Sequence, residues 1–151
     1  MIHVLRIGRW NIPGKPTAIL VDFKQFLTRQ NEILTTFWKK FGVDSLTGNW
    51  DYRESALFGY AAGRVIESFY NYNLQSSDKV VAQFHEWMTG AGLLYLKSIN
   101  IPVATVFTTH ATVIGRCIAG NYLPLYDGLL GYNADEKARQ FNVVARHSLE
   151  K

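Results

Sequence analysis

The chain has 151 residues, of which 48% are hydrophobic and 19% are charged, a balance that is typical of one globular domain and excludes an intrinsically disordered chain. Its net charge of +4 comes from scattered lysines and arginines, so a nucleic-acid-binding surface is not expected. A single cysteine, Cys117, rules out an internal disulfide, and because neither a secretory signal nor a run of 18 apolar residues is present, we expect a cytoplasmic protein without a membrane span.

The first half of the chain predicts a β-hairpin followed by two helices. We expect strands at 3–7 and 17–23, and helices at 24–40 and 52–72. Segment 11–16, between the strands, holds two prolines and a glycine, which indicates a hairpin-like turn. Gly42 is placed to end the first helix.

The second half predicts strands that alternate with helices. The expected order is strand 79–84, helix 87–98, strand 102–107 and helix 111–119, with a last helix near 135–150. This alternation favours an α/β fold with a parallel sheet and right-handed crossovers. The second strand leads into the run Val106-Phe-Thr-Thr-His-Ala-Thr-Val-Ile-Gly-Arg116 and is expected to be buried.

Polar side chains follow both of these strands, at the point where each one ends. His85, Glu86 and Trp87 follow the first strand, and Thr109 and His110 follow the second. Neighbouring strands lie about 4.8 Å apart, so we expect the two turns to converge on one edge of the sheet, where α/β proteins bind ligands. Each residue taken alone has a structural explanation: a carboxylate at a helix N-terminus, a core tryptophan, a helix cap or a histidine that holds the turn.

Arg116 lies in the helix expected at 111–119, from which its guanidinium could reach the phosphate of a ligand. A surface salt bridge is the alternative. The sequence holds no P-loop, no dinucleotide glycine fingerprint, no paired histidines or cysteines at metal-ligand spacing and no Gly-x-Ser-x-Gly elbow, so neither a metal site nor a hydrolase is expected. Tyr122, Tyr126 and Tyr132 could stack on sugar rings or, alternatively, cover a sheet edge.

Several of these motifs together resemble a known family. They are the segment Gln83-Phe-His-Glu-Trp-Met-Thr-Gly-Ala-Gly92, the run from Val106 to Arg116, Asn133-Ala-Asp-Glu-Lys137, and upstream Gly8-Arg-Trp-Asn-Ile-Pro-Gly14 with Ala18-Ile-Leu-Val-Asp22. They resemble the amino-terminal domain of glycogen synthases of the animal and fungal type. The resemblance extends over nearly the whole chain and is looser over 31–75.

The resemblance implies a two-domain glycosyltransferase of the GT-B type, with Rossmann-like domains that face each other across a cleft. Such enzymes transfer glucose from a nucleotide sugar, usually UDP-glucose, to the non-reducing end of an α-1,4-glucan. They retain the anomeric configuration and use no metal or other cofactor. By the same resemblance, His110 and Glu86 are catalytic, and His110 also contacts the donor together with Arg116.

The resemblance also assigns His85, Trp87 and Thr109 to substrate binding. We expect residues 1–151 to form a single incomplete Rossmann-like domain without the carboxy-terminal domain, and therefore to be inactive in isolation. The parent enzyme is expected to be a homo-oligomer. Two alternatives stay open, namely a non-catalytic glucan-binding or regulatory module, and a related transferase that uses ADP-glucose.

Overall fold

The computed structural model describes residues 3–142 of the chain. Its elements follow in the order β1 (His3–Arg9), β2 (Thr17–Asp22), η1 (Lys24–Arg29), α1 (Gln30–Phe41), α2 (Trp50–Asn73), β3 (Val81–His85), α3 (Trp87–Ser98), β4 (Ala104–Thr108), α4 (Val113–Gly120), α5 (Leu125–Gly128), η2 (Leu129–Gly131) and α6 (Ala134–Gln140). The fold is mixed α/β, as expected, and its described part holds two separate two-stranded sheets.

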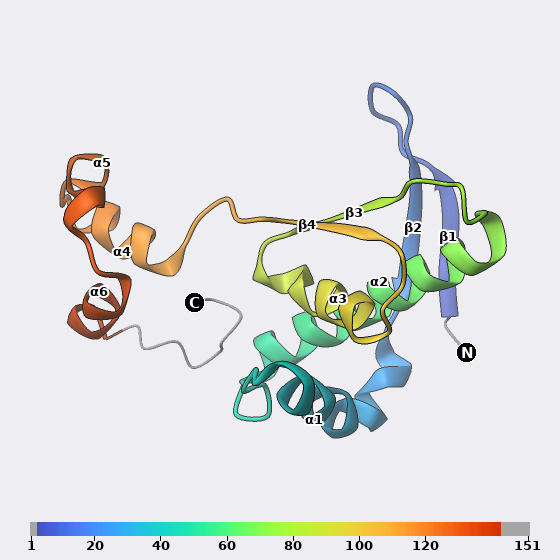
Figure 1. The fold of residues 1–151 in the computed structure, drawn as a ribbon, viewed down its shortest axis with the longest axis horizontal. Coiled ribbons are helices and arrows are strands. Elements are labelled where there is room, and N and C mark those ends of the chain that lie inside the picture. The colour runs from blue at the N-terminus through green and yellow to red at the C-terminus, as the bar shows by residue number, and fades with distance from the viewer. Residues whose placement is uncertain (1–2, 143–151) are drawn as a thin grey trace.

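Strands β1 and β2 form the predicted hairpin. They pair antiparallel, with Ile7 opposite Ile19. The connecting turn closes with a hydrogen bond from the Trp10 N–H to the Pro16 carbonyl oxygen, 2.9 Å. Gly14 lies in this turn at φ 82°, a conformation that glycine adopts without steric cost. Figure 1 shows the hairpin standing beside α2, with its turn projecting from the rest of the molecule.

The helix predicted over 24–40 is present in two parts. Its first six residues form the tighter 3₁₀ helix η1, and α1 begins only at Gln30. Arg29, the last residue of η1, has φ −112°, which is outside helical geometry. The tight turn places the buried Phe26 ring edge-on against Tyr60, with ring centroids 5.2 Å apart. Gly42 ends α1 at φ 67°, as predicted.

Helices α2 and α3 form the centre of the molecule. The Asn49 side chain accepts a hydrogen bond from the Tyr52 N–H and so starts α2 two residues before the predicted boundary. The two helices approach closely at glycines: a Cβ atom on Gly92 would lie 2.6 Å from the carbonyl oxygen of Gly59. Tyr60 of α2 packs against both buried clusters of the core, which are therefore continuous.

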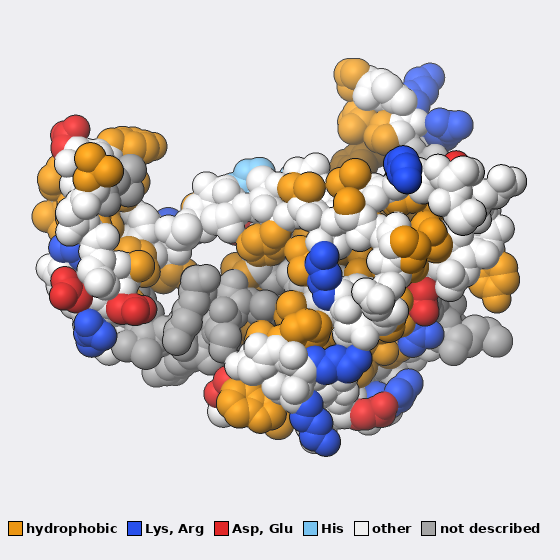
Figure 2. All heavy atoms as spheres, in the orientation of Figure 1, with side chains coloured by type: hydrophobic (Ala, Val, Ile, Leu, Met, Phe, Trp, Pro, Cys, Tyr) orange, Lys and Arg blue, Asp and Glu red, His pale blue; other side chains and the backbone are white. Residues whose placement is uncertain are grey.

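The predicted parallel pair is confirmed, because β3 and β4 pair in parallel with α3 as the crossover between them. One face of this pair packs on α3, where Ala82 and Phe84 are buried with Leu96. The expectation that the second strand is buried was wrong: Val106 and Phe107 are 45% and 44% exposed. Phe107 pairs with the buried Phe84 and shares its face, which α3 covers only over β3, whereas Val106 lies on the opposite face, which no described element covers. Figure 2 shows hydrophobic side chains at the surface in this part of the molecule.

Helices α4, α5 and α6 form a separate group that follows an extended stretch of chain after β4 (Figure 1). The tyrosine hydroxyl of Tyr132 donates to the carbonyl oxygen of Pro124 at 2.6 Å, so this ring packs within the group instead of covering a sheet edge. The helix predicted near 135–150 is present only as α6, which ends before Asn142 at φ 53°. Residues 143–150 of that prediction lie outside the described part of the chain.

Candidate functional site

The carboxyl ends of β3 and β4 bring the two predicted turns together. Their register places His85 opposite Thr108 at the last ladder position. The Glu86 N–H then donates to the Thr108 carbonyl oxygen at 2.9 Å, so pairing continues one residue into the turn. Two residues before His85, on the same face of β3, the Gln83 side-chain amide donates to the Thr108 hydroxyl at 2.9 Å. The convergence expected from the sequence is therefore confirmed.

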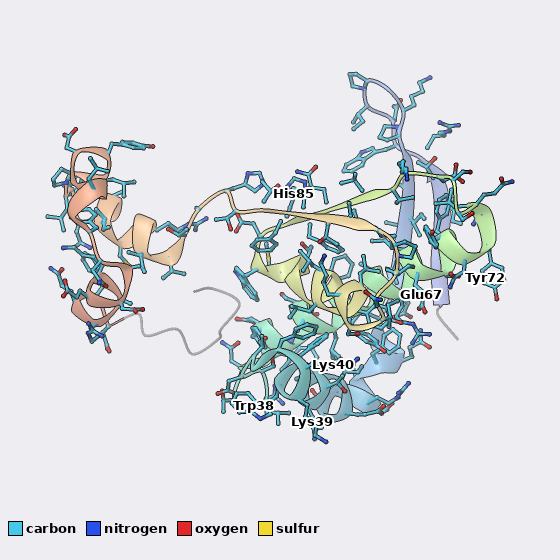
Figure 3. The ribbon with its side chains drawn as sticks, in the orientation of Figure 1. Trp38, Lys39, Lys40, Glu67, Tyr72 and His85 are labelled. Atoms are coloured by element: carbon cyan, nitrogen blue, oxygen red, sulfur yellow. The ribbon has the colours of Figure 1, made fainter. Side chains whose placement is uncertain are left out.

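His85 and His110 form a stacked pair at this edge. Their rings lie 5.2 Å apart at an interplanar angle of 9°, and His85 Nδ1 lies 2.9 Å from His110 Nε2. One of the two nitrogens must donate and the other accept, because each neutral imidazole carries one N–H and one lone pair. Both side chains are exposed, and Figure 3 shows His85 projecting from β3 on the side away from α3. The pair thus presents polar chemistry to solvent.

Glu86 connects the two turns through its side chain. Its Oε1 atom accepts hydrogen bonds from the backbone N–H groups of His110, at 2.6 Å, and Ala111, at 3.2 Å. Its backbone has φ 61° and ψ 166°, an unfavourable conformation for a residue with a Cβ, with a typical cost of about 1–3 kcal/mol. The carboxylate makes no capping hydrogen bond to α3. Glu86 does lie at the N-terminus of α3, where a carboxylate is favoured for structural reasons alone, but its carboxylate in addition fixes the His110 turn.

A pocket of about 400 Å³ opens beside this turn. It is lined by His110, Ala111, Thr112, Gly115, Arg116, Ala119, Leu125 and Tyr126. The Thr112 hydroxyl caps α4 by accepting the Gly115 N–H at 3.0 Å. Arg116 is exposed and forms no salt bridge with the described residues, so the alternative of a surface salt bridge is not observed within 3–142. The pocket offers an unneutralised guanidinium next to an imidazole, a combination suited to an anionic ligand.

Two of the predicted site residues lie apart from this arrangement. The Trp87 ring stacks on Tyr52, with centroids 6.0 Å apart, and packs against the core. Thr109 is exposed and does not line the pocket. In contrast, Gln83 was not singled out from the sequence, although its position two residues before His85 on a strand places both on one face. The structure thus groups His85, Glu86, His110 and Arg116.

Within 3–142, no three or more histidine, cysteine, aspartate or glutamate side chains are grouped so that they could hold a metal ion. No helix in the same range is both long and apolar enough to cross a bilayer.

Comparisons with known proteins identify the family. The family model described as glycogen synthase matches residues 2–151. The chain belongs to the glycogen synthase family. It is 33% identical over 150 residues to the glycogen (starch) synthase of Dictyostelium discoideum, which covers 99% of the chain. It is 32% identical over 146 residues to isoform 2 of Saccharomyces cerevisiae and 29% identical over 147 residues to the liver enzyme of Rattus norvegicus, which cover 95% and 97% of the chain.

These matches confirm the resemblance found in the sequence motifs. The chain spans only 16% of the Dictyostelium relative, 20% of the yeast relative and 21% of the rat relative.

Proposed function

We propose that the protein acts as a glycogen synthase, which transfers glucose from UDP-glucose to the non-reducing end of an α-1,4-glucan with retention of configuration. The observation that carries this proposal is the pocket shared by His110 and Arg116 at the carboxyl edge of a parallel strand pair, in a chain that the glycogen synthase model matches over residues 2–151. The reaction is proposed to take place in the cytoplasm and without a metal or cofactor.

The pocket supplies the charge that this reaction needs. Transfer from a nucleotide sugar develops positive charge on the glucose and negative charge on the departing diphosphate. Arg116 has no ion-pair partner among residues 3–142, so its guanidinium is available to the diphosphate. His110 lines the same pocket, and its side chain is assigned to orientation of the donor glucose.

Glu86 acts mainly by fixing this geometry. Its Oε1 atom is engaged by the N–H groups of His110 and Ala111, so the carboxylate holds the turn on which the donor-binding histidine lies. We assign to the same carboxylate the positioning of the sugar, through its other oxygen. Trp87 and Thr109 remain predicted substrate-binding residues. His85 was predicted to bind substrate as well, but in the structure its Nδ1 atom contacts His110 Nε2 at 2.9 Å.

A second, facing domain of the GT-B type completes the proposed site. The pocket is about 400 Å³ and its lining residues lie between 110 and 126, and we propose that the facing domain supplies the surfaces for the nucleoside and the acceptor glucan. A half-formed cleft neither excludes water nor holds two substrates in register. A polypeptide limited to residues 1–151 is accordingly proposed to be inactive.

A transfer assay tests this proposal. The native protein that carries these residues is incubated with maltoheptaose and either UDP-glucose or ADP-glucose, and the product is analysed by NMR for the anomeric configuration of the new linkage. Extension by an α-1,4-linked glucose, faster with UDP-glucose, is the expected result. Extension with ADP-glucose but not with UDP-glucose would show that ADP-glucose is the donor. Malto-oligosaccharide binding that is independent of nucleotide, with no transfer, would favour a glucan-binding module instead.

A further inference from the structure

We propose that His85 is a positioning residue, which acts on the donor through the ring of His110 and does not itself touch the substrate. The inference rests on the proposed function, because it assigns how His110 is oriented within that reaction. It begins from the contact between His85 Nδ1 and His110 Nε2 at 2.9 Å.

This contact couples the tautomers of the two rings. If His85 Nδ1–H donates, His110 Nε2 accepts, so the proton of His110 lies on Nδ1 and that atom can donate to a ligand. If instead His110 Nε2–H donates, its Nδ1 is left as an acceptor. The two tautomers are therefore linked, and the pair leaves Nδ1 as the ring nitrogen of His110 that is not engaged by His85 and can face a ligand.

The position of His85 is itself well fixed. It is the last residue of β3 and pairs in register with Thr108, and the Gln83–Thr108 side-chain bond on the same face reinforces that register. His110, in contrast, lies beyond the end of β4, in a turn. A strand residue thus orients a turn residue, and the relation follows from the fold without any ligand.

Glu86 restrains the backbone of the same histidine. Its carboxylate accepts the N–H groups of His110 and Ala111, so consecutive residues 85 and 86 hold the ring and the main chain of His110 respectively. Besides this carboxylate, the charged side chain that shares the pocket with His110 is Arg116. The His85 side chain takes no part in the Glu86 hydrogen bonds, so we expect the turn to remain in place when His85 is altered.

A double-mutant cycle in the native protein tests the proposal. The variants are His85→Leu, His85→Asn, His110→Ala and the double variant His85→Leu/His110→Ala, and kcat/KM for UDP-glucose is measured for each. Loss of one oriented hydrogen bond predicts a decrease of about 10-fold for His85→Leu. Asparagine places a polar atom near the position of Nδ1, so His85→Asn is expected to recover most of the activity.

The double variant distinguishes an indirect from a direct role. If His85 acts only through His110, its replacement has no further effect once His110 is alanine, and the double variant equals His110→Ala. Multiplicative losses in the double variant would show that His85 acts independently of His110, and an equal loss for His85→Asn and His85→Leu would show that a polar atom near Nδ1 is not required. Either result would overturn the proposal.

Imidazole ¹⁵N NMR of the histidine-labelled native protein provides a readout that does not depend on activity. We expect the His110 ring to show one dominant tautomer in the wild-type protein and a mixture of tautomers in His85→Leu. Unchanged His110 signals in His85→Leu would overturn the inference whatever the activity. An absence of glucosyl transfer by the wild-type protein would instead refute the proposed function, while the NMR result would still decide the relation between the rings.

Discussion

The Oε1 atom of Glu86 accepts a hydrogen bond from the backbone N–H of His110 at 2.6 Å. Strand pairing alone ends at Thr108, so this side-chain bond extends the alignment of the two chain segments beyond the sheet. A charge-assisted bond of this kind is stronger than a neutral one, and it offsets the unfavourable backbone conformation of Glu86 at φ 61°. The proposed donor site is therefore built on a carboxylate that holds a turn.

Replacement of Glu86 tests this structural role. In Glu86→Ala the N–H groups of His110 and Ala111 lose their acceptor, so their amide hydrogen exchange is expected to accelerate by about 10-fold or more. Glu86→Gln keeps an oxygen acceptor without the charge, so its exchange rates at His110 and Ala111 are expected to lie between those of the wild-type protein and Glu86→Ala. Hydrogen exchange resolved at single residues measures the effect.

Gln83→Ala is the matched control for Glu86→Ala. Gln83 lies on β3, three residues before Glu86, but its side chain bonds the Thr108 side chain and not the turn N–H groups, so exchange at His110 and Ala111 is expected to be unchanged. Equal acceleration in both variants would mean that general loosening of the strand ends, and not the Glu86 carboxylate, controls the turn.

Close contact between α2 and α3 predicts a packing defect in Gly92→Ala. The new methyl group would lie 2.6 Å from the Gly59 carbonyl oxygen and 2.6 Å from Phe84 Cε1, so the helices must separate. The expected loss in the free energy of unfolding is about 1–3 kcal/mol, measured by urea denaturation. In Gly120→Ala nothing lies within 4 Å of the new atom, and stability is expected to be unchanged or slightly higher.

Tyr95 predicts a dependence of stability on alkaline pH. Its side chain is 8% exposed and its hydroxyl donates to Glu67 Oε2 at 2.7 Å. Burial, followed by this hydrogen bond, raises the pKa of Tyr95 above its ordinary value. Because the folded-state pKa is the higher one, the stabilisation is fully present below the unfolded pKa of about 10 and is lost as the pH rises through the folded-state pKa.

Tyr95→Phe isolates this effect. At pH 8 the variant is expected to be less stable than the wild-type protein by about 1.5 kcal/mol, because a hydrogen bond to a carboxylate is lost. Thermal unfolding followed from pH 8 to 11 should show that the difference between the two proteins shrinks above about pH 10. A difference that stays constant over this range would contradict the assigned raised pKa.

Arg116 predicts a specific defect in donor binding. Removal of its guanidinium in Arg116→Ala takes away the positive charge of the pocket, so the KM for UDP-glucose is expected to increase by about 10-fold or more. The matched control is Arg139→Ala, which removes an exposed arginine of α6 that is not part of the pocket. Similar changes in KM for both variants would show a nonspecific charge effect.

The sequence predicted the main features of the fold and of the site because they depend on local patterns. The alternation from 79 to 119 and the αL glycine at Gly42 both follow from spacing and backbone preference. The convergence of His85 and His110 followed from the general geometry of parallel strands.

Other features depend on which elements pack against each other in the folded chain, and the spacing of residues in the sequence does not specify this packing. Val106 is as apolar as a residue of a buried strand, but it is 45% exposed. Only the position of α3 in the structure shows that its side chain is not covered. The reach of the Glu86 carboxylate to the next turn depends on its left-handed backbone, which no residue preference predicts for glutamate. The stacking of Trp87 on Tyr52 likewise joins elements that are far apart in the chain.

The rate of glucosyl transfer by His110→Ala tests the central claim most directly. The native protein and this variant are compared for transfer from UDP-glucose to maltoheptaose, at equal concentration and after verification of equal thermal stability. Because His110 contacts the donor in the proposed mechanism, the variant is expected to lose about 100-fold or more in kcat/KM. Equal transfer by the two proteins would show that the paired histidines at the end of β3 and β4 do not form the donor site.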